Sequence, residues 1–145
     1  MKTKEFVSHL DETAITAGIA EAERKSSGEI RVFISNKHVP DALGEAQKQF
    51  VRSGMDRTKA RNGVLIYFAP RSQTFAIVGD AGIHAKAGDG LWNHIAEAMA
   101  EHLKQSDYTG AILVAVSEVG KVLAQHFPRE PGDTDELSNQ ILRDE

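Results

Sequence analysis

Residues 62–79, NGVLIYFAPRSQTFAIVG, decide the fold class of this chain. The stretch 62–70 is a nearly continuous run of apolar residues rich in β-formers, which predicts a central strand buried on both faces. The stretch 74–79, TFAIVG, has the same character, and only PRSQ separates the two. Strands joined by so short a connector pair antiparallel, so this region predicts a hairpin.

A further strand is predicted upstream of the hairpin. In EIRVFISN, at 29–36, Ile30, Val32 and Ile34 alternate with Arg31, Phe33 and Ser35, which is the period of a β-strand. A helix is predicted from Pro40 to about Asp56, with its core-facing residues at Leu43, Ala46, Phe50 and Val51. Because this helix joins the strand at 29–36 to the strand at 62–70, those two strands should be parallel.

Further helices are predicted before and after these strands along the chain. Residues 11–26 form an amphipathic pattern that begins at Asp11, a good N-cap residue. Residues 90–104 carry an apolar stripe made of Leu91, Ile95, Met99 and Leu103, and the apolar stretch 108–127 predicts a buried helix. The polar and acidic tail, about 129–145, is expected to be loosely docked or frayed. With neither repeat nor linker, residues 1–145 are interpreted as a single domain.

Composition excludes several classes of function. The 145 residues carry a net charge of −4, without the basic patch typical of nucleic-acid binding. There is no cysteine, which excludes disulfides, thiolate metal sites and a cysteine nucleophile. The first residues, MKTKEFVSHLDETAI, lack the apolar core of a signal peptide, and no stretch approaches the roughly 20 apolar residues of a transmembrane helix. A cytoplasmic location is therefore expected.

The predicted strand order gathers oxygen-bearing side chains at one edge of the sheet. Glu29 begins the first strand, Asn62 precedes the second, and Asp80 ends the third, so all three should lie at the same rim. A glycine-rich loop is expected after Asp80, and it supplies Asp89. Carboxylate, amide and main-chain oxygens suit a hard cation, Ca²⁺ or Mg²⁺. The spacing does not match an EF-hand, and Asp80 and Asp89 also suit strand-ending and helix-capping roles. Both interpretations can hold together.

Several motifs resemble the TPM domain family, in its soluble bacterial branch. They are GEIRV at 28–32, NGVLIY at 62–67, GDAGI at 79–83, Trp92, DYTGAI at 107–112, and the ending FP with DTDEL at 127–137. The resemblance implies a three-layer α/β/α sandwich around a mixed sheet of about four strands. It also implies divalent-cation binding, chiefly calcium, at loops on one rim, with Asp80, Asp89 and Glu29 as the matching positions. A weak phosphatase activity is associated with some plant members.

Two functional hypotheses follow, together with a plainer third. The first is a calcium-binding module without chemistry of its own, whose protein partner the sequence does not name. The second is a metal-dependent phosphatase, for which Lys86 would hold the phosphate. The third is a protein-interaction domain whose acidic loop merely keeps it in solution.

Two further polar groups are better explained as solvated surface than as metal sites. They are the set His94, Glu97, Glu101 and His102 on the helix at 90–104, and the acidic tail residues Asp133, Asp135 and Glu136.

Overall fold

The apolar segments around residues 29–34, 63–69 and 74–79 form the centre of a four-stranded sheet in the order β3-β2-β1-β4. The structure is a computed structural model that describes residues 1–129 and 141–144, apart from the side chain of Asp89. Strands β1 and β2 are parallel, whereas β2 and β3 form an antiparallel hairpin, as predicted. The strands are β1 (Glu29–Ile34), β2 (Gly63–Ala69), β3 (Thr74–Gly79) and β4 (Leu142–Arg143).

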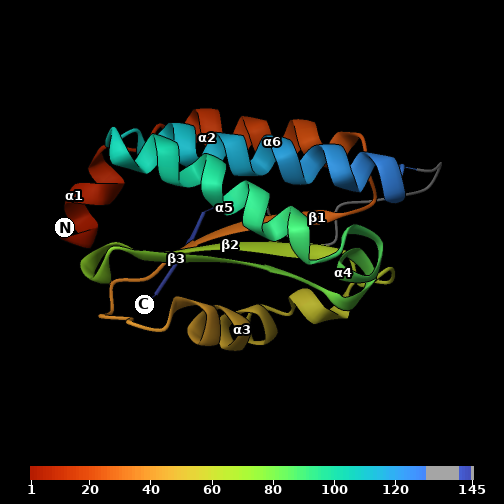
Figure 1. Cartoon of the computed structure of the whole chain (residues 1–145), viewed down its shortest axis with the longest axis horizontal. Coiled ribbons are helices and arrows are strands. Elements are labelled where there is room, and N and C mark those ends of the chain that lie inside the picture. The colour runs from red at the N-terminus through yellow and green to blue at the C-terminus, as the bar shows by residue number, and fades with distance from the viewer. Residues whose placement is uncertain (130–140, 145) are drawn as a thin grey trace.

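Helices cover both faces of this sheet (Figure 1). Helix α3 lies on one face, and α2, α5 and α6 lie on the other, which confirms the predicted α/β/α sandwich. The helices are α1 (Thr3–Ser8), α2 (Glu12–Arg24), α3 (Ala42–Arg52), α4 (Ala81–Ala87), α5 (Asp89–Lys104) and α6 (Tyr108–His126), with short 3₁₀ turns η1 (Met55–Arg57) and η2 (Pro70–Ser72).

The two faces of the sheet bury separate apolar clusters. Strand residues such as Ile30, Val64 and Ile66 pack beneath α2, α5 and α6, where Ile95 and Met99 of the predicted α5 stripe are fully buried. On the other face, Phe33 and residues of β2 pack against α3. Both β1 and β2 are buried along their whole length, which explains the near-continuous apolar run of β2.

Helix α3 presents a different face to the sheet from the predicted one. Ala46 and Phe50 are buried, but Leu43 and Val51 are 52% and 58% exposed. Ala42, Ala46 and Phe50 are spaced four residues apart and therefore form a single stripe. A stripe with two alanines lets α3 approach the sheet closely, and this tertiary packing decides the rotation of the helix.

Both ends of the chain hold structure that the sequence did not reveal. Helix α1 buries Phe6, whose ring lies 5.5 Å from that of Phe68 and 4.9 Å from that of Tyr108. At the other end, Leu142 and Arg143 pair with β1, so the tail supplies the fourth strand of the sheet. The tail was expected to be loosely docked, and for these residues the expectation was wrong. The acidic residues Asp133, Asp135 and Glu136 lie outside the described part of the chain.

Candidate functional site

The strand register brings three of the four predicted metal ligands to one rim of the sheet. Glu29 pairs with Gly63 across β1 and β2, and the Asp80 N–H donates to the Gly63 carbonyl at 2.9 Å, so Glu29 and Asp80 flank Gly63. Asn62 immediately precedes Gly63. All three side chains are buried: Glu29 is 2% exposed, Asn62 1% and Asp80 6%. The topological prediction that these residues share one edge is confirmed.

The pleat of the sheet also places the Glu29 and Asp80 side chains on the same face. Phe33 in β1 and Ala76 in β3 pack on the α3 side, and alternation along each strand carries Glu29 and Asp80 to that side. Between them Gly63 leaves a space, above which lies the Met55 carbonyl oxygen, only 3.0 Å from where a Cβ on Gly63 would be. Two carboxylates and a main-chain carbonyl therefore surround a glycine at the rim.

Asp80 is held by a guanidinium rather than left open. Arg61 donates from Nε to Asp80 Oδ2 at 2.7 Å and from Nη2 to Oδ1 at 2.8 Å, a bidentate pair. Asp80 also accepts from the Ala81 N–H at 2.7 Å and so caps α4. The hydrogen bond and the charge of Asp80 raise the pKa of Arg61. Sequence reasoning missed Arg61, because its partner is nineteen residues away and only the fold unites them.

The expected glycine-rich loop after Asp80 is wrong: residues 81–87 form helix α4. The Asp80 carbonyl accepts from the His84 N–H and the His84 carbonyl from the Gly88 N–H, each at 3.0 Å, so this segment is a turn of helix and not the open loop that was predicted. Glycine at position 82 lets the backbone of α4 approach residues 60–61 closely. The Gly82 N–H donates to the Arg61 carbonyl at 2.8 Å, and a Cβ on residue 82 would lie only 2.2 Å from the Ala60 carbonyl oxygen. Among the glycines of the expected loop, Gly88 is the one that adopts a left-handed φ, at 76°.

Asn62 makes a structural hydrogen bond at the rim, and Asp89 begins helix α5. The Asn62 side chain donates from Nδ2 to Ser27 Oγ at 3.1 Å, which ties the start of β2 to the turn before β1. Asp89 is the first residue of α5, and Gly88 takes the N-cap position that we had considered for Asp89. The side chain of Asp89 lies outside the described atoms.

A buried charge cluster continues from the rim into the sheet. Arg31 is 6% exposed and Glu23 2%, and Glu23 Oε2 accepts from the Ile30 N–H at 2.8 Å. Burial lowers the pKa of Arg31, and the charges of Glu29 and Glu23 oppose that shift. In EIRVFI, Glu29 and Arg31 are two residues apart and therefore lie on the same face of β1. That spacing is the sequence signal from which this cluster could have been predicted.

Asp56, in η1, is a further carboxylate near the rim that the sequence did not indicate. Its Oδ1 atom is buried and, among the described residues, has no hydrogen-bond partner. The charge of Asp56 also acts on Arg61, which places it within electrostatic reach of the Arg61–Asp80 pair. A buried carboxylate oxygen without a donor is the kind of group that a cation satisfies.

Comparison with known proteins agrees with this architecture. A family model described as the TPM domain matches residues 1–122. The chain belongs to the TPM domain family. It is similar to the BA42 protein of the psychrophilic bacterium Bizionia argentinensis, at 37% identity and a TM-score of 0.84 over 92% of each chain. No curated protein matches.

Two further solved structures share the fold at lower identity. One is the N-terminal domain of a P. gingivalis protein, at 20% identity and a TM-score of 0.62, covering 82% of this chain and 80% of that one. The other is the N-terminal domain of the cg2496 protein of Corynebacterium glutamicum, at 20% identity and 0.61, covering 86% and 77%.

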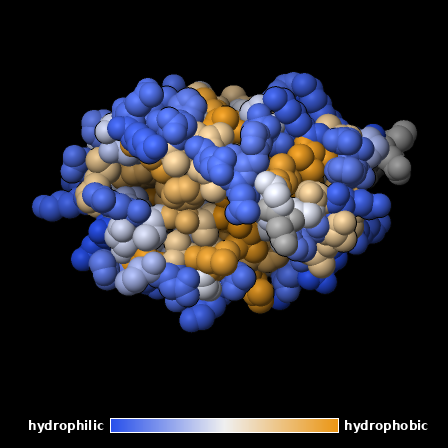
Figure 2. All heavy atoms as spheres, viewed as in Figure 1, coloured by the Kyte–Doolittle hydropathy of each residue, from blue (hydrophilic) through white to orange (hydrophobic). Residues whose placement is uncertain are grey.

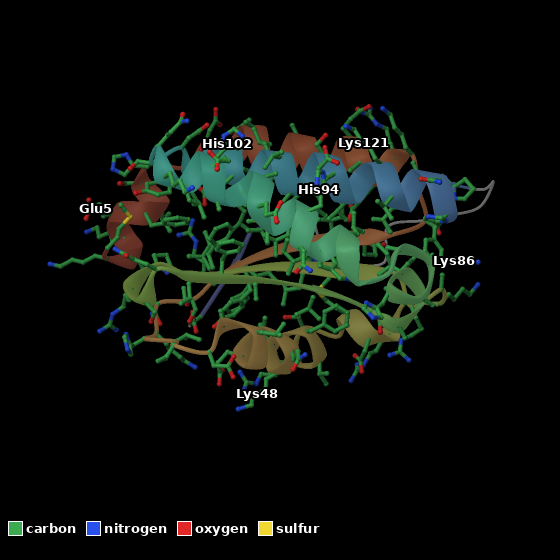
Figure 3. The ribbon with its side chains drawn as sticks, in the orientation of Figure 1. Glu5, Lys48, Lys86, His94, His102 and Lys121 are labelled. Carbon is green, nitrogen blue, oxygen red and sulfur yellow. The ribbon has the colours of Figure 1, made fainter. Side chains whose placement is uncertain are left out.

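Within this TPM domain, the remaining sequence candidates are dispersed. In the described part of the chain, with the rim around Gly63 included, no three His, Asp or Glu side chains form a group that could hold a metal ion. His94 and His102 lie at separate points along α5, and Lys86 lies on α4 at the end of the molecule (Figure 3). Over the same described residues, no helix is both long and apolar enough to cross a membrane.

Proposed function

We propose that this TPM domain binds a divalent cation, Ca²⁺ ahead of Mg²⁺, at the rim around Gly63, and acts as a binding or accessory module. The observation that carries the proposal is the burial of Glu29 and Asp80 on one face of the sheet, on either side of a glycine. The Met55 carbonyl oxygen lies above the same glycine, and Asp56, whose Oδ1 has no hydrogen-bond partner among the described residues, acts electrostatically on Arg61. Carboxylates and carbonyls in an irregular arrangement suit Ca²⁺ better than Mg²⁺, which demands near-octahedral geometry.

Arg61 acts in this proposal as the internal counter-cation of the site. It occupies both oxygens of Asp80, so a metal ion gains that carboxylate only when the guanidinium leaves. The Arg61 side chain is 52% exposed and can turn into water, whereas the Asp80 side chain is 5% exposed and stays at the rim. An ion that replaces Arg61 keeps the buried carboxylate compensated. Asn62 shapes the rim through Ser27, and Asp89 begins the adjacent helix from which it would complete the ligand set.

Titration with calcium followed by backbone amide shifts tests this function. We expect shifts around Glu29, Gly63 and Asp80, and we expect the Asp80→Asn variant, which keeps a cap acceptor but loses the charge, to lose them. The Arg61→Gln variant should bind calcium about tenfold more tightly, since it removes the competitor. Arg57→Gln, an equal change of charge on an exposed neighbour, is the matched control.

Two outcomes would count against the site. Weak protein sites bind calcium in the roughly millimolar range. If the amide shifts stay unchanged up to about 10 mM calcium, the proposed calcium binding is wrong. If Arg61→Gln and wild type bind calcium with equal affinity, Arg61 does not compete with the ion for Asp80.

The alternative, a metal-dependent phosphatase, has less support. Lys86, which was expected to hold the phosphate, is exposed on α4, and Arg61 is engaged by Asp80. Turnover of a phosphomonoester that rises with Mg²⁺ and falls in Asp80→Asn would favour it over binding alone. The cytoplasmic location stays a prediction.

A further inference from the structure

Strand β3 is an edge strand without the usual protection. It pairs with β2 on one side, and among the described residues nothing pairs with its other side. Its sequence, TFAIVG, contains neither a charged residue nor proline, although exposed edges normally carry such residues to prevent strand addition. Figure 2 shows apolar residues across the middle of the face on which β3 and α5 meet the viewer.

The register shows which backbone groups of β3 face outward. The Asp80 N–H bonds to the Gly63 carbonyl, and hydrogen-bonded pairs recur at every second residue of an antiparallel ladder. Thr74, Ala76 and Val78 therefore bond to β2, while the N–H and C=O groups of Phe75, Ile77 and Gly79 point away from it. Where water does not bond to them, a row of such groups at every second residue is matched by an added extended backbone and not by a helix.

A pocket of about 460 Å³ lies at the start of β3, at the end of the sheet opposite Asp80. Its apolar lining includes Phe6, Phe68, Phe75, Leu103 and Tyr108. Lys104 carries the one charged side chain that lines it in the described chain, and no acidic residue does so there. Lys104 Nζ lies 3.4 Å from Glu101 Oε1, but both side chains are at least 70% exposed, so that pair is weak and Lys104 is available.

We propose that β3 binds the carboxyl-terminal segment of a partner protein as an added antiparallel strand. A strand running antiparallel to β3 ends at the start of β3, where the pocket lies. The residue opposite Phe75 carries its side chain on the face of Phe75, toward α5, so a large apolar terminal residue enters the pocket. The terminal carboxylate then lies beside Lys104, which is the charge complement that selects a chain end.

An acetylated peptide of alternating Thr and Val that ends in Phe with a free carboxylate is a suitable probe. On titration, we expect amide shifts and slowed hydrogen exchange at Phe75, Ile77 and Gly79. Exchange at Ala76 and Val78, already bonded to β2, should change little. The amidated peptide should bind about five- to tenfold more weakly, as expected for loss of one partly exposed charge-assisted hydrogen bond.

Substitution of Lys104 separates charge recognition from folding. Lys104→Gln should weaken the free-acid peptide about five- to tenfold and leave the amidated peptide unchanged. Lys121→Gln is the matched control, because Lys121 on α6 is equally exposed and lies 3.3 Å from Glu118 in the same i,i+3 arrangement. Peptide shifts that avoid β3, or equal binding of acid and amide, would overturn the proposal. Protection of Phe75 and Ile77 by self-association without peptide would overturn it in favour of a second copy.

Discussion

Substitution of Gly82 tests whether α4 is fixed to the rim by backbone contact. In Gly82→Ala the new Cβ would lie 2.2 Å from the Ala60 carbonyl oxygen and 2.6 Å from that of Arg61, where real Cβ contacts do not fall below 3.0 Å. The nearest contact is thus about 0.8 Å too short, and because both atoms belong to the backbone, α4 must move as a unit. Movement of α4 also pulls Asp80, its N-cap, away from its partners.

The size of the effect follows from three opposing contributions. Relief of the overlap costs about 1–3 kcal/mol, and loss of one main-chain hydrogen bond costs about 1 kcal/mol. Replacing glycine by alanine returns about 0.4–1 kcal/mol through the unfolded state. The net loss is about 2 kcal/mol, which for a domain of this size lowers the Tm by about 4–8 °C.

Gly90→Ala is the matched control, because Gly90 is also the second residue of its helix and a Cβ there meets nothing within 4 Å. That variant should be more stable than wild type by about 0.4–1 kcal/mol. The assay is urea and thermal unfolding followed by circular dichroism, with Trp92 fluorescence as a local probe because its ring packs over Gly79. Equal stabilities of the two variants would refute the backbone contact between α4 and residues 60–61.

Three further predictions concern the helical layer. Met99→Ala removes a fully buried side chain from α5 and should lower the free energy of unfolding by about 2–5 kcal/mol in denaturant titration; a loss below 1 kcal/mol would show that the core collapses into the cavity. Asp11→Ala removes the acceptor of the Ala14 N–H at the start of α2 and should cost about 1 kcal/mol, which the same titration measures, whereas an unchanged value would mean that water replaces the cap. Hydrogen bonds from His102 and the Gly110 N–H lower the pKa of Asp107 below 3.8, so the stability that it contributes is complete above that value and is lost as the pH falls through the lower folded value; an acid titration in which wild type and Asp107→Asn lose stability in parallel would contradict this.

Local sequence patterns were sufficient for most of the fold. The hairpin at 62–79, the parallel pairing of β1 with β2 and the stripe of α5 were all predictable, because periodicity and connector length depend on neighbouring residues alone. The same topology, predictable from the sequence, places Glu29, Asn62 and Asp80 at one rim. The rotation of α3 was not predictable, since Leu43 and Val51 are as apolar as the residues that are buried.

The environment of the rim required the tertiary structure. Helix α4 looks like a loop in sequence because it contains glycine, yet Gly82 is there to admit the carbonyls of Ala60 and Arg61. Arg61 and Asp56 fall in a short polar connector without periodicity. Only the fold brings Arg61 to Asp80 and leaves the Asp56 Oδ1 atom without a donor among the described residues. The fourth strand also depends on tertiary structure, because Leu142 and Arg143 become strand residues by pairing with the free edge of β1. Sequence alone thus determined the three central strands, the way they pair, and helices α2, α3, α5 and α6, whereas α1, α4 and β4 became visible only in the tertiary structure. Partners distant along the chain decided the charge balance at the rim, because an ion pair forms where the backbone brings two groups together.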